Sequence, residues 1–269
     1  MKDSKRYHLR QGEEGLTSNI LREIWRHPGK FPGIYPVQTR ANYERVTGSD
    51  WEWWFGNDRD GWMGYAVQAK KLYTQKSKKK NANWENGGYS ELNHKVAGKY
   101  QYKILNDYAR RRGMIPLYAF YNHIVKTSYG CYWQCCDHPQ QPDERKLGIT
   151  VTPLATVRRA LSPKHKMPRT FDAIHKCRRT LPARCLVCPK GWGIYPANAE
   201  QGNVPAHPGW KIYHSKAELY DKKRLDDHLE SIQQERRGKS WNDDVVEFSA
   251  TGVLKFHTDH KAPDETPSG

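Results

Sequence analysis

Two strand-like segments separated by a short polar connection constrain this sequence more than any other feature. The segments TGSDWEWWF (residues 47–55) and WMGYAVQAK (residues 62–70) are rich in aromatic residues, and the connection between them ends in Asp60-Gly61. Runs of this composition on either side of an Asp-Gly turn are typical of an antiparallel hairpin. We therefore expect a hairpin whose turn centres near residue 59 or 60.

Strand geometry divides the side chains of this hairpin between two faces. A turn near residue 59 or 60 places Asp50 opposite Gln68 or Lys70, and Glu52 near Gln68. Two carboxylates, an amide and an ammonium group then gather on one face, as in a metal-dependent site or a salt-bridged sheet edge. The other face carries Trp51, Trp53, Val67 and Ala69.

The segments around the hairpin predict an α/β core. Apolar residues at helical spacing predict a helix over residues 13–26, and FPGIYP (residues 31–36) reads as an irregular crossing. A second amphipathic helix is expected over residues 89–112, ending at Gly113, followed by an apolar strand over residues 115–121. Farther on, we expect short helical pieces within residues 150–190, a helix over residues 216–236 and a strand over residues 245–248.

The hairpin motif resembles the PD-(D/E)XK nuclease superfamily. Gly48-Ser49-Asp50 enters the first strand and Gln68-Ala69-Lys70 ends the second, as in the Mrr-like restriction and phage-defence branch, where QxK replaces (D/E)xK. The string GSDWEWWF…VQAK is also similar to a family of bacterial and prophage proteins within this branch. The resemblance covers about the first 125 residues. It implies a restriction-endonuclease-like core: a helix, an antiparallel hairpin or three-stranded sheet, a second helix and a strand.

Within this resemblance, three hairpin residues take roles in the chemistry. Asp50 matches the metal-binding aspartate, Gln68 the second ligand through its amide oxygen, and Lys70 the lysine that orients the attacking water. Mg²⁺ prefers oxygen ligands and keeps several waters, so such a set suits one or two Mg²⁺ ions. Gln68 departs from the family pattern because it is neutral, and Glu52 on the same face is a candidate to restore the charge.

The first predicted helix adds a carboxylate, for which two candidates stay open. At 100° per residue, Glu13 lies closer than Glu14 to the buried stripe that begins at Leu16. The family pattern instead aligns better with Glu14. Gln101, on the second helix, matches the glutamines with which relatives approach the site.

The charge balance favours a polyanionic partner. Of the 269 residues, 45 are Lys or Arg and 29 are Asp or Glu, which gives a net charge of +16. Lys71 and the run Lys78, Lys79 and Lys80 are candidate DNA contacts, although such runs are more often solvated loops. Trp84 and Tyr89 suit base stacking less well than a place in the core.

The cysteines allow a structural zinc site. Cys185 and Cys188 have the CxxC spacing of zinc ligands. Cys131 with Cys135 offers a second pair, and Cys136 or His138 could take part instead. Buried free cysteines are the slightly favoured alternative. Thiolates suit zinc rather than Mg²⁺, so any such site is separate from the nuclease site.

Together these patterns predict a Mg²⁺-dependent DNA endonuclease in restriction, phage defence or repair. The alternatives are an inactive nucleic-acid-binding module on the same fold and a junction resolvase. We expect a nuclease core over residues 1–125, an elaboration over residues 126–257 and a disordered tail over residues 258–269. The mean hydropathy of −0.97 excludes an integral membrane protein, and the charged amino terminus favours the cytoplasm. The expected partners are DNA and either a second copy of the chain or a defence-system protein.

Overall fold

A computed structural model describes ten parts of the chain, namely residues 26, 34–39, 45–59, 61–73, 87–122, 148–164, 167–176, 179–183, 217–237 and 251–257. The strands are β1 (Ile34–Thr39), β2 (Trp51–Asn57), β3 (Gly61–Lys71), β4 (Lys95–Val96), β5 (Lys99–Tyr100), β6 (Ile115–Tyr121), β7 (Ile149–Pro153), β8 (Leu181–Pro182), β9 (Leu219–Tyr220) and β10 (Thr251–His257). The helices are the short 3-10 helix η1 (Ser90–Asn93), α4 (Gln101–Arg111), α5 (Leu154–Leu161), α6 (Phe171–His175) and α8 (Lys222–Arg237).

The hairpin expected from the sequence is present and consists of β2 and β3. Trp51 pairs with Val67 and Asn57 pairs with Gly61, in antiparallel register. Continued by one residue, this register sets Asp50 opposite Gln68, the first of the two alternatives that the turn position allowed. The Trp62 indole donates to the Asp58 carboxylate at 2.9 Å and closes the turn. A local turn signal was sufficient here because neighbouring segments pair with each other.

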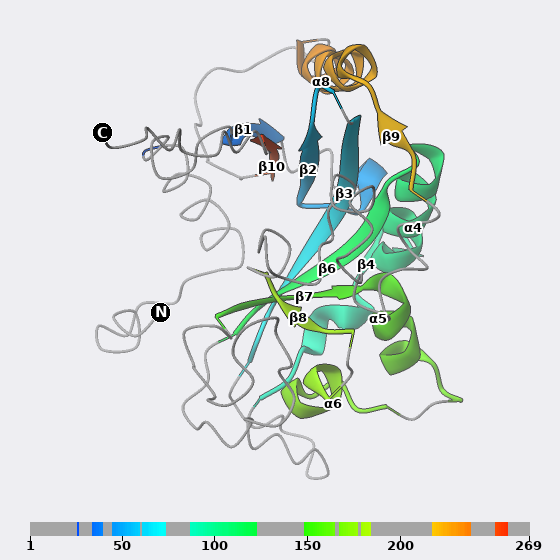
Figure 1. Cartoon of the computed structure of the whole chain (residues 1–269). Coiled ribbons are helices and arrows are strands. Elements are labelled where there is room, and N and C mark those ends of the chain that lie inside the picture. Colours follow the sequence, from blue (N-terminus) through cyan, green and yellow to red (C-terminus); the bar gives the residue numbers. More distant parts are fainter. Residues whose placement is uncertain are drawn as a thin grey trace, which may run out of the picture.

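The hairpin lies in the middle of a mixed sheet, and the chain has a mixed α/β fold. The strand order is β1-β10-β2-β3-β6-β7-β8, and β9 pairs with the beginning of β3. β3 and β6 are parallel and are connected through α4, as parallel neighbours require. Strands from both halves of the sequence therefore share one sheet (Figure 1).

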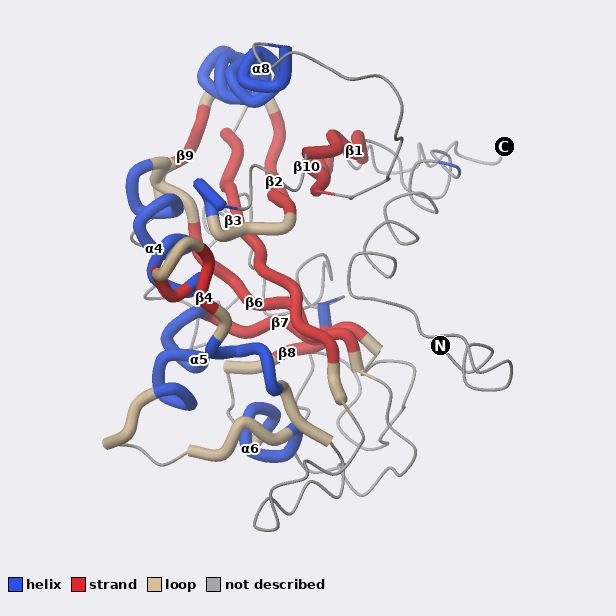
Figure 2. The backbone as a smooth tube through the Cα atoms, turned by 180° about the vertical axis from the view of Figure 1, so that it is seen from behind, coloured by secondary structure: helices blue, strands red, loops and turns tan. Residues whose placement is uncertain are grey.

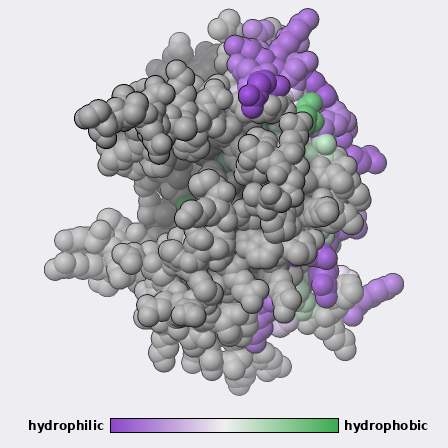
Figure 3. Space-filling view, in the orientation of Figure 1, coloured by the Kyte–Doolittle hydropathy of each residue, from purple (hydrophilic) through white to green (hydrophobic). Residues whose placement is uncertain are grey.

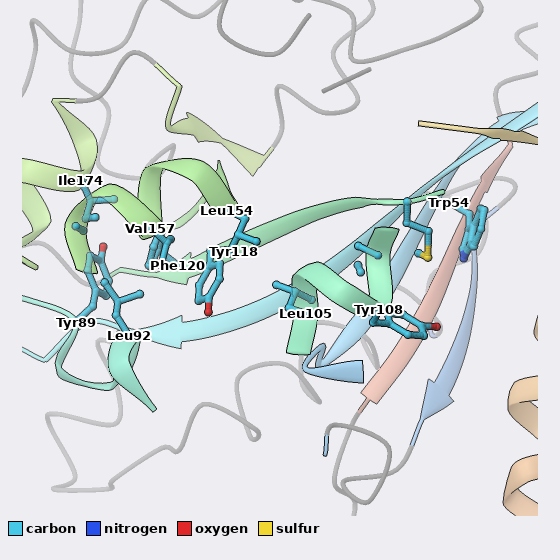
Figure 4. Packing of buried hydrophobic residues seen from close by; sticks show 14 of the residues in the cluster. Trp54, Tyr89, Leu92, Leu105, Tyr108, Tyr118, Phe120, Leu154, Val157 and Ile174 are labelled. Carbon is cyan, nitrogen blue, oxygen red and sulfur yellow. The ribbon is translucent and has the colours of Figure 1, made fainter. Parts of the chain in front are cut away.

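Alternation along the strands separates two hydrophobic clusters. One cluster contains Trp54 and Trp62 of the hairpin together with side chains of all four α-helices, which pack on the same face. The other contains Trp51, Trp53 and Val67 on the opposite face. Figure 2 shows α4 and α5 side by side along the sheet, and Figure 4 shows how their side chains meet the strands. The face that carries Asp50, Gln68 and Lys70 is the helix-covered one.

The second predicted helix is shorter than expected. Residues 89–100 form η1 and the β4–β5 hairpin, and α4 begins only at Gln101. Ala97 and Gly98 both have positive φ, 48° and 79°, and this turn interrupts helical backbone. The predicted end is confirmed, because Gly113 follows α4 with φ +62°.

Several other boundaries differ from the sequence expectations. Residues 34–36, interpreted as irregular, lie in β1, where Pro36 is tolerated because β1 is at the sheet edge. β10 lies between β1 and β2 and runs parallel to β2. β1, β2 and β3 therefore do not form a three-stranded antiparallel sheet. The carboxy-terminal strand is Thr251–His257, and α8 begins at Lys222 rather than at residue 216. The short helices within residues 150–190 are confirmed as α5 and α6.

Some predicted features lie outside the described residues. These are most of the first helix with Glu13 and Glu14, the predicted strand over residues 245–248, the run Lys78–Lys80, Trp84, the tail over residues 258–269, and all four candidate zinc ligands, Cys131, Cys135, Cys185 and Cys188. In the described part of the chain, no helix combines the length and apolar character needed to cross a membrane.

Candidate functional site

The turn that precedes β2 is held against the beginning of α4. Gly48 has φ +67°, and a Cβ atom added there would lie 2.5 Å from the Leu105 nitrogen and 2.9 Å from the Gln101 carbonyl oxygen. No side chain fits between these backbones, so the glycine before Ser49-Asp50 has a steric reason. The Ser49 amide and hydroxyl both donate to the Thr47 hydroxyl, at 3.1 and 2.9 Å. These contacts fix the position of Asp50.

The Asp50 carboxylate is bound to β3 across the hairpin. Its Oδ2 atom accepts hydrogen bonds from Gln68 Nε2 at 2.6 Å and from the Ala69 backbone amide at 2.5 Å. The Asp50 amide in turn donates to the Val67 carbonyl at 2.7 Å. As a whole residue, Asp50 is half-buried.

The amide oxygen of Gln68 is buried and has no hydrogen-bond partner. Gln68 is fully buried, and its Nε2 atom donates to Asp50 and to the Ala69 carbonyl, the latter at 3.2 Å. Oε1 has no hydrogen-bond partner, and the same is true of the buried amide oxygen of Gln101. A buried acceptor left without a donor destabilises a fold by ~1–3 kcal/mol. An unsatisfied atom of this kind calls for a functional or structural reason.

Lys70 lies two residues beyond Gln68, on the same face of β3. It is only 4% exposed, and its backbone pairs with Phe120 of β6. Lysine is seldom buried to this extent unless its ammonium group is paired. Lys71 is half-buried and, as the next residue along the strand, points to the opposite face. The two lysines therefore serve different sides of the sheet.

Gln101 also lies at this end of the sheet. It is 1% exposed and is the first residue of α4, with its backbone amide donating to the His94 carbonyl at 3.0 Å. Its own carbonyl is the atom against which Gly48 packs. The Gln101 backbone therefore contacts the turn two residues before Asp50, and the approach of its side chain to the site stays a prediction.

Glu52 belongs to a separate buried cluster rather than to the Asp50 pair. Its carboxylate accepts from Trp54 Nε1 at 3.1 Å, from His228 Nε2 at 2.8 Å and from the Tyr108 hydroxyl. These donors come from β2, α8 and α4, and Figure 4 shows Tyr108 reaching from α4 toward the strand that carries Trp54. Both oxygens of Glu52 are occupied. The expectation that Glu52 supplements the charge at Gln68 is therefore replaced by a role in docking α8.

The cluster keeps Glu52 ionised in spite of its burial. Burial raises the pKa of Glu52, but the charge of His228 and the hydrogen bonds from His228, Tyr108 and Trp54 outweigh burial, so that the net pKa lies below 4.5. Sequence reasoning did not find His228, which lies 176 residues from Glu52 along the chain. No local pattern connects two residues this far apart.

The residues around Asp50 fit a hard divalent cation. One carboxylate and one unpartnered amide oxygen are ligands of the type that Mg²⁺ prefers. No group of three His, Cys, Asp or Glu side chains converges anywhere in the described ranges, so this set is smaller and less charged than an all-carboxylate site. Tyr89, weighed as a stacking platform, is fully buried and belongs to the core.

Comparison with known protein families places most of the chain in one family. The model of a family of unknown function (DUF6615) matches residues 1–258, and the chain belongs to this family. The match includes the hairpin, α4 and α8, so the Asp50 turn and the Glu52 cluster both lie within it. No curated protein matches the chain.

Proposed function

We propose that this protein is a metal-dependent DNA endonuclease with a restriction-endonuclease-like core, acting in restriction, phage defence or repair. The order hairpin, α4, parallel strand agrees with the order that the resemblance implies for such a core. Asp50, Gln68 and Lys70 share one face at the end of the hairpin, next to the start of α4. The net charge of +16 suits a polyanionic substrate.

The unpartnered Oε1 atom of Gln68 is the observation that carries this proposal. A purely structural glutamine in a tightly packed sheet would be expected to satisfy its oxygen, because leaving it unpaired weakens the fold. A cation ligand satisfies it only when the ion is present. The neighbouring Asp50 carboxylate supplies the negative charge that such an ion needs.

Each residue has a role in the proposed reaction. Asp50 and Gln68 hold the cation through a carboxylate and an amide oxygen. When bound, Mg²⁺ acidifies water and offsets the negative charge that develops on the scissile phosphate. Lys70, buried beside them, orients the attacking water and donates to a phosphate oxygen. Gly48 and Gln101 position the Asp50 turn against α4 and do not take part in bond breaking.

Cleavage of plasmid DNA in Mg²⁺ and in EDTA tests the proposal. We expect nicking or linearisation in Mg²⁺, none in EDTA, and none in either condition for Lys70→Ala. Binding of DNA by Lys70→Ala is expected to persist, because much of the affinity comes from counterion release over the whole basic surface. Absence of Mg²⁺-dependent cleavage in the wild-type protein would overturn the proposal.

The Gln68→Glu variant tests the metal ligand directly. Without metal, the new carboxylate faces Asp50 and lowers the melting temperature. Mg²⁺ is expected to restore this temperature and to half-saturate at a concentration roughly fivefold lower than in the wild type, since a unit charge about 4 Å from another contributes ~1 kcal/mol even in water. The exposed Asn93→Asp variant adds the same charge elsewhere and controls for net charge. Equal responses of both variants to Mg²⁺ would argue against Gln68 as a ligand.

A second candidate function is nucleic-acid binding without catalysis. It is favoured by the neutrality of Gln68, whose Nε2 atom already satisfies Asp50 in the absence of any ion. Such a protein would keep the fold and the basic surface but bind Mg²⁺ or Mn²⁺ no better than Asp50→Ala does. Isothermal titration with Mn²⁺ separates the two functions, because only the nuclease is expected to show a site that Asp50→Ala removes.

A further inference from the structure

A short hairpin lies directly before α4 in the sequence. β4 and β5 pair in antiparallel register, and Ala97-Gly98 form the turn with positive φ at both residues. This is the backbone of a two-residue turn with the twist that hairpins favour. A Cβ atom added at Gly98 would meet nothing within 4 Å, so none of the described segments packs on the turn there.

Lysines dominate the surface of this segment, here called the lysine hairpin (residues 94–103). Lys95, Lys99 and Lys103 are exposed, and the sequence contains no Asp or Glu between Glu91 and Asp107. Within the described part of the chain, none of the three lysines forms an ion pair. In Figure 3, hydrophilic residues gather over α8 and on the side of the molecule that carries α4. The lysine hairpin therefore presents positive charge that the described residues do not neutralise.

Tyr100 draws two of these charges together. The Lys95 ammonium lies 4.7 Å from the centroid of the Tyr100 ring, and that of Lys103 lies 5.7 Å from it. Tyr102 stacks on Tyr100 with centroids 5.5 Å apart and supports the ring. An anion that approaches this ring is attracted by both ammonium groups.

The lysine hairpin is anchored at the same place as the Asp50 turn. The Gln101 amide donates to the His94 carbonyl at the base of the hairpin, at 3.0 Å. The Gln101 carbonyl faces Gly48, two residues before Asp50. A polyanion that enters the Asp50 site with one segment can therefore reach the lysines with the next.

We infer that the lysine hairpin binds the phosphate backbone of duplex DNA beside the Asp50 site. The inference rests on the proposed function for its choice of DNA, whereas the charged surface is independent of any catalysis. Lysines act on phosphates as point charges and do not read bases at such contacts. The lysine hairpin thus contacts the duplex without reading its sequence, and it orients the duplex over the β2–β3 hairpin.

Salt-dependent binding tests this inference. The probe is a fluorescent 30-bp duplex in EDTA, so that no cleavage occurs, titrated between 50 and 200 mM KCl. The triple variant K95Q/K99Q/K103Q is expected to reduce the slope of log affinity against log salt by up to about 2.7, which is about 0.9 per lost phosphate contact. The salt-induced loss of affinity over this range then shrinks about 40-fold. The matched control K164Q/K222Q/K223Q removes three exposed lysines of α8 and of the residues after α5.

The outcomes separate this inference from the proposed function. Reduced slope in the hairpin variant and a wild-type slope in the control support the lysine hairpin, even if the protein never cleaves DNA. Equal slopes in both variants, or a hairpin variant identical to the wild type, overturn the inference while Mg²⁺-dependent cleavage can stand. Selective loss of binding to a 30-bp RNA duplex instead of DNA also overturns it. Circular dichroism melting of both variants confirms that these exposed substitutions leave the fold intact.

Discussion

Two buried polar groups lie on the same face of one sheet and differ in how completely they are satisfied. In the first, Tyr89 donates to Asn122 at 2.5 Å, Asn122 donates to Thr150 at 3.0 Å, and the Thr150 hydroxyl meets His175 Nε2 at 2.8 Å. His175 Nδ1 lies 2.7 Å from the Phe171 carbonyl, and because a carbonyl can only accept, Nδ1 carries the hydrogen. Every polar side-chain atom of this chain of bonds has a partner. This chain of hydrogen bonds therefore needs no ligand to satisfy it.

The second group, around Asp50, leaves the Gln68 oxygen unpaired. Networks that are fully satisfied make a core rigid and specific, whereas partly satisfied ones weaken it. Proteins depart from local satisfaction mostly at functional sites. The comparison therefore predicts a structural role for the His175 chain and a ligand for the Asp50 pair. The same measurements on variants of both groups test this prediction.

The largest expected effect is the separation of activity from stability in two neighbouring acids. Asp50→Asn is expected to lower the cleavage rate by about a thousandfold or more, since several kcal/mol of charge stabilisation depend on the metal ligand. Glu52→Gln is expected to lower the free energy of unfolding by about 3–5 kcal/mol, because it breaks a buried pair and leaves His228 without its carboxylate.

Urea unfolding and plasmid cleavage, each measured on both variants, check this separation. The folded fraction of Glu52→Gln should cleave at a rate close to that of the wild type. The free energy of unfolding of Asp50→Asn should lie within about 1 kcal/mol of the wild-type value. A Glu52 variant that folds normally but does not cleave would return Glu52 to the catalytic set.

The sequence predicts those parts of the fold in which segments close together in the sequence pair with each other. The β2–β3 register follows from strand alternation and a local Asp-Gly turn, and it assembles Asp50, Gln68 and Lys70 without further information. The helix start at Gln101 could not be predicted, because the helical spacing of apolar residues continues through Val96 and Tyr100. Ala97 adopts a positive φ, and no local sequence pattern predicts this.

Long-range pairing explains the other differences. β10 enters the sheet between β1 and β2 only because distant segments meet, and the Glu52–His228 pair joins elements from opposite ends of the chain. A charged residue that faces aromatic neighbours gives no sign, in one sequence, of whether its partner is a metal or a distant histidine. The interpretation of Glu52 failed for this reason.

Acid should weaken the fold through the His175 chain. Burial lowers the pKa of His175 from 6.5 to about 3, against a smaller opposite effect of the hydrogen bond to Phe171. Below pH 6.5, His175 therefore binds a proton in the unfolded chain but not in the folded protein. Its contribution to the free energy of unfolding is fully present above pH 6.5 and decreases on acidification toward pH 3. At ~1.4 kcal/mol per pH unit, the loss at pH 5 is about 2 kcal/mol.

Urea unfolding between pH 7 and pH 5 measures this loss, and His175→Gln is the control because it cannot titrate. The variant starts from a lower stability but should show a flatter dependence in this range. Glu52 acts at lower pH with the same sign: its pKa is lowered from 4.5, so its contribution is present above pH 4.5 and is lost below it. An equally steep dependence in His175→Gln would show that another group controls the acid response.

The smallest expected effect is the most direct comparison of the two groups. Gln68→Met removes the unpaired oxygen together with the hydrogen bond to Asp50, and because these changes have opposite signs, we expect the free energy of unfolding to change by less than about 1 kcal/mol. Thr150→Val removes a hydroxyl that both accepts and donates, and it leaves Asn122 and His175 unpaired, which costs about 1–3 kcal/mol. Cleavage should be lost in the first variant and retained in the second. A Gln68→Met protein destabilised as much as Thr150→Val would mean that Gln68, too, is there to hold the sheet together.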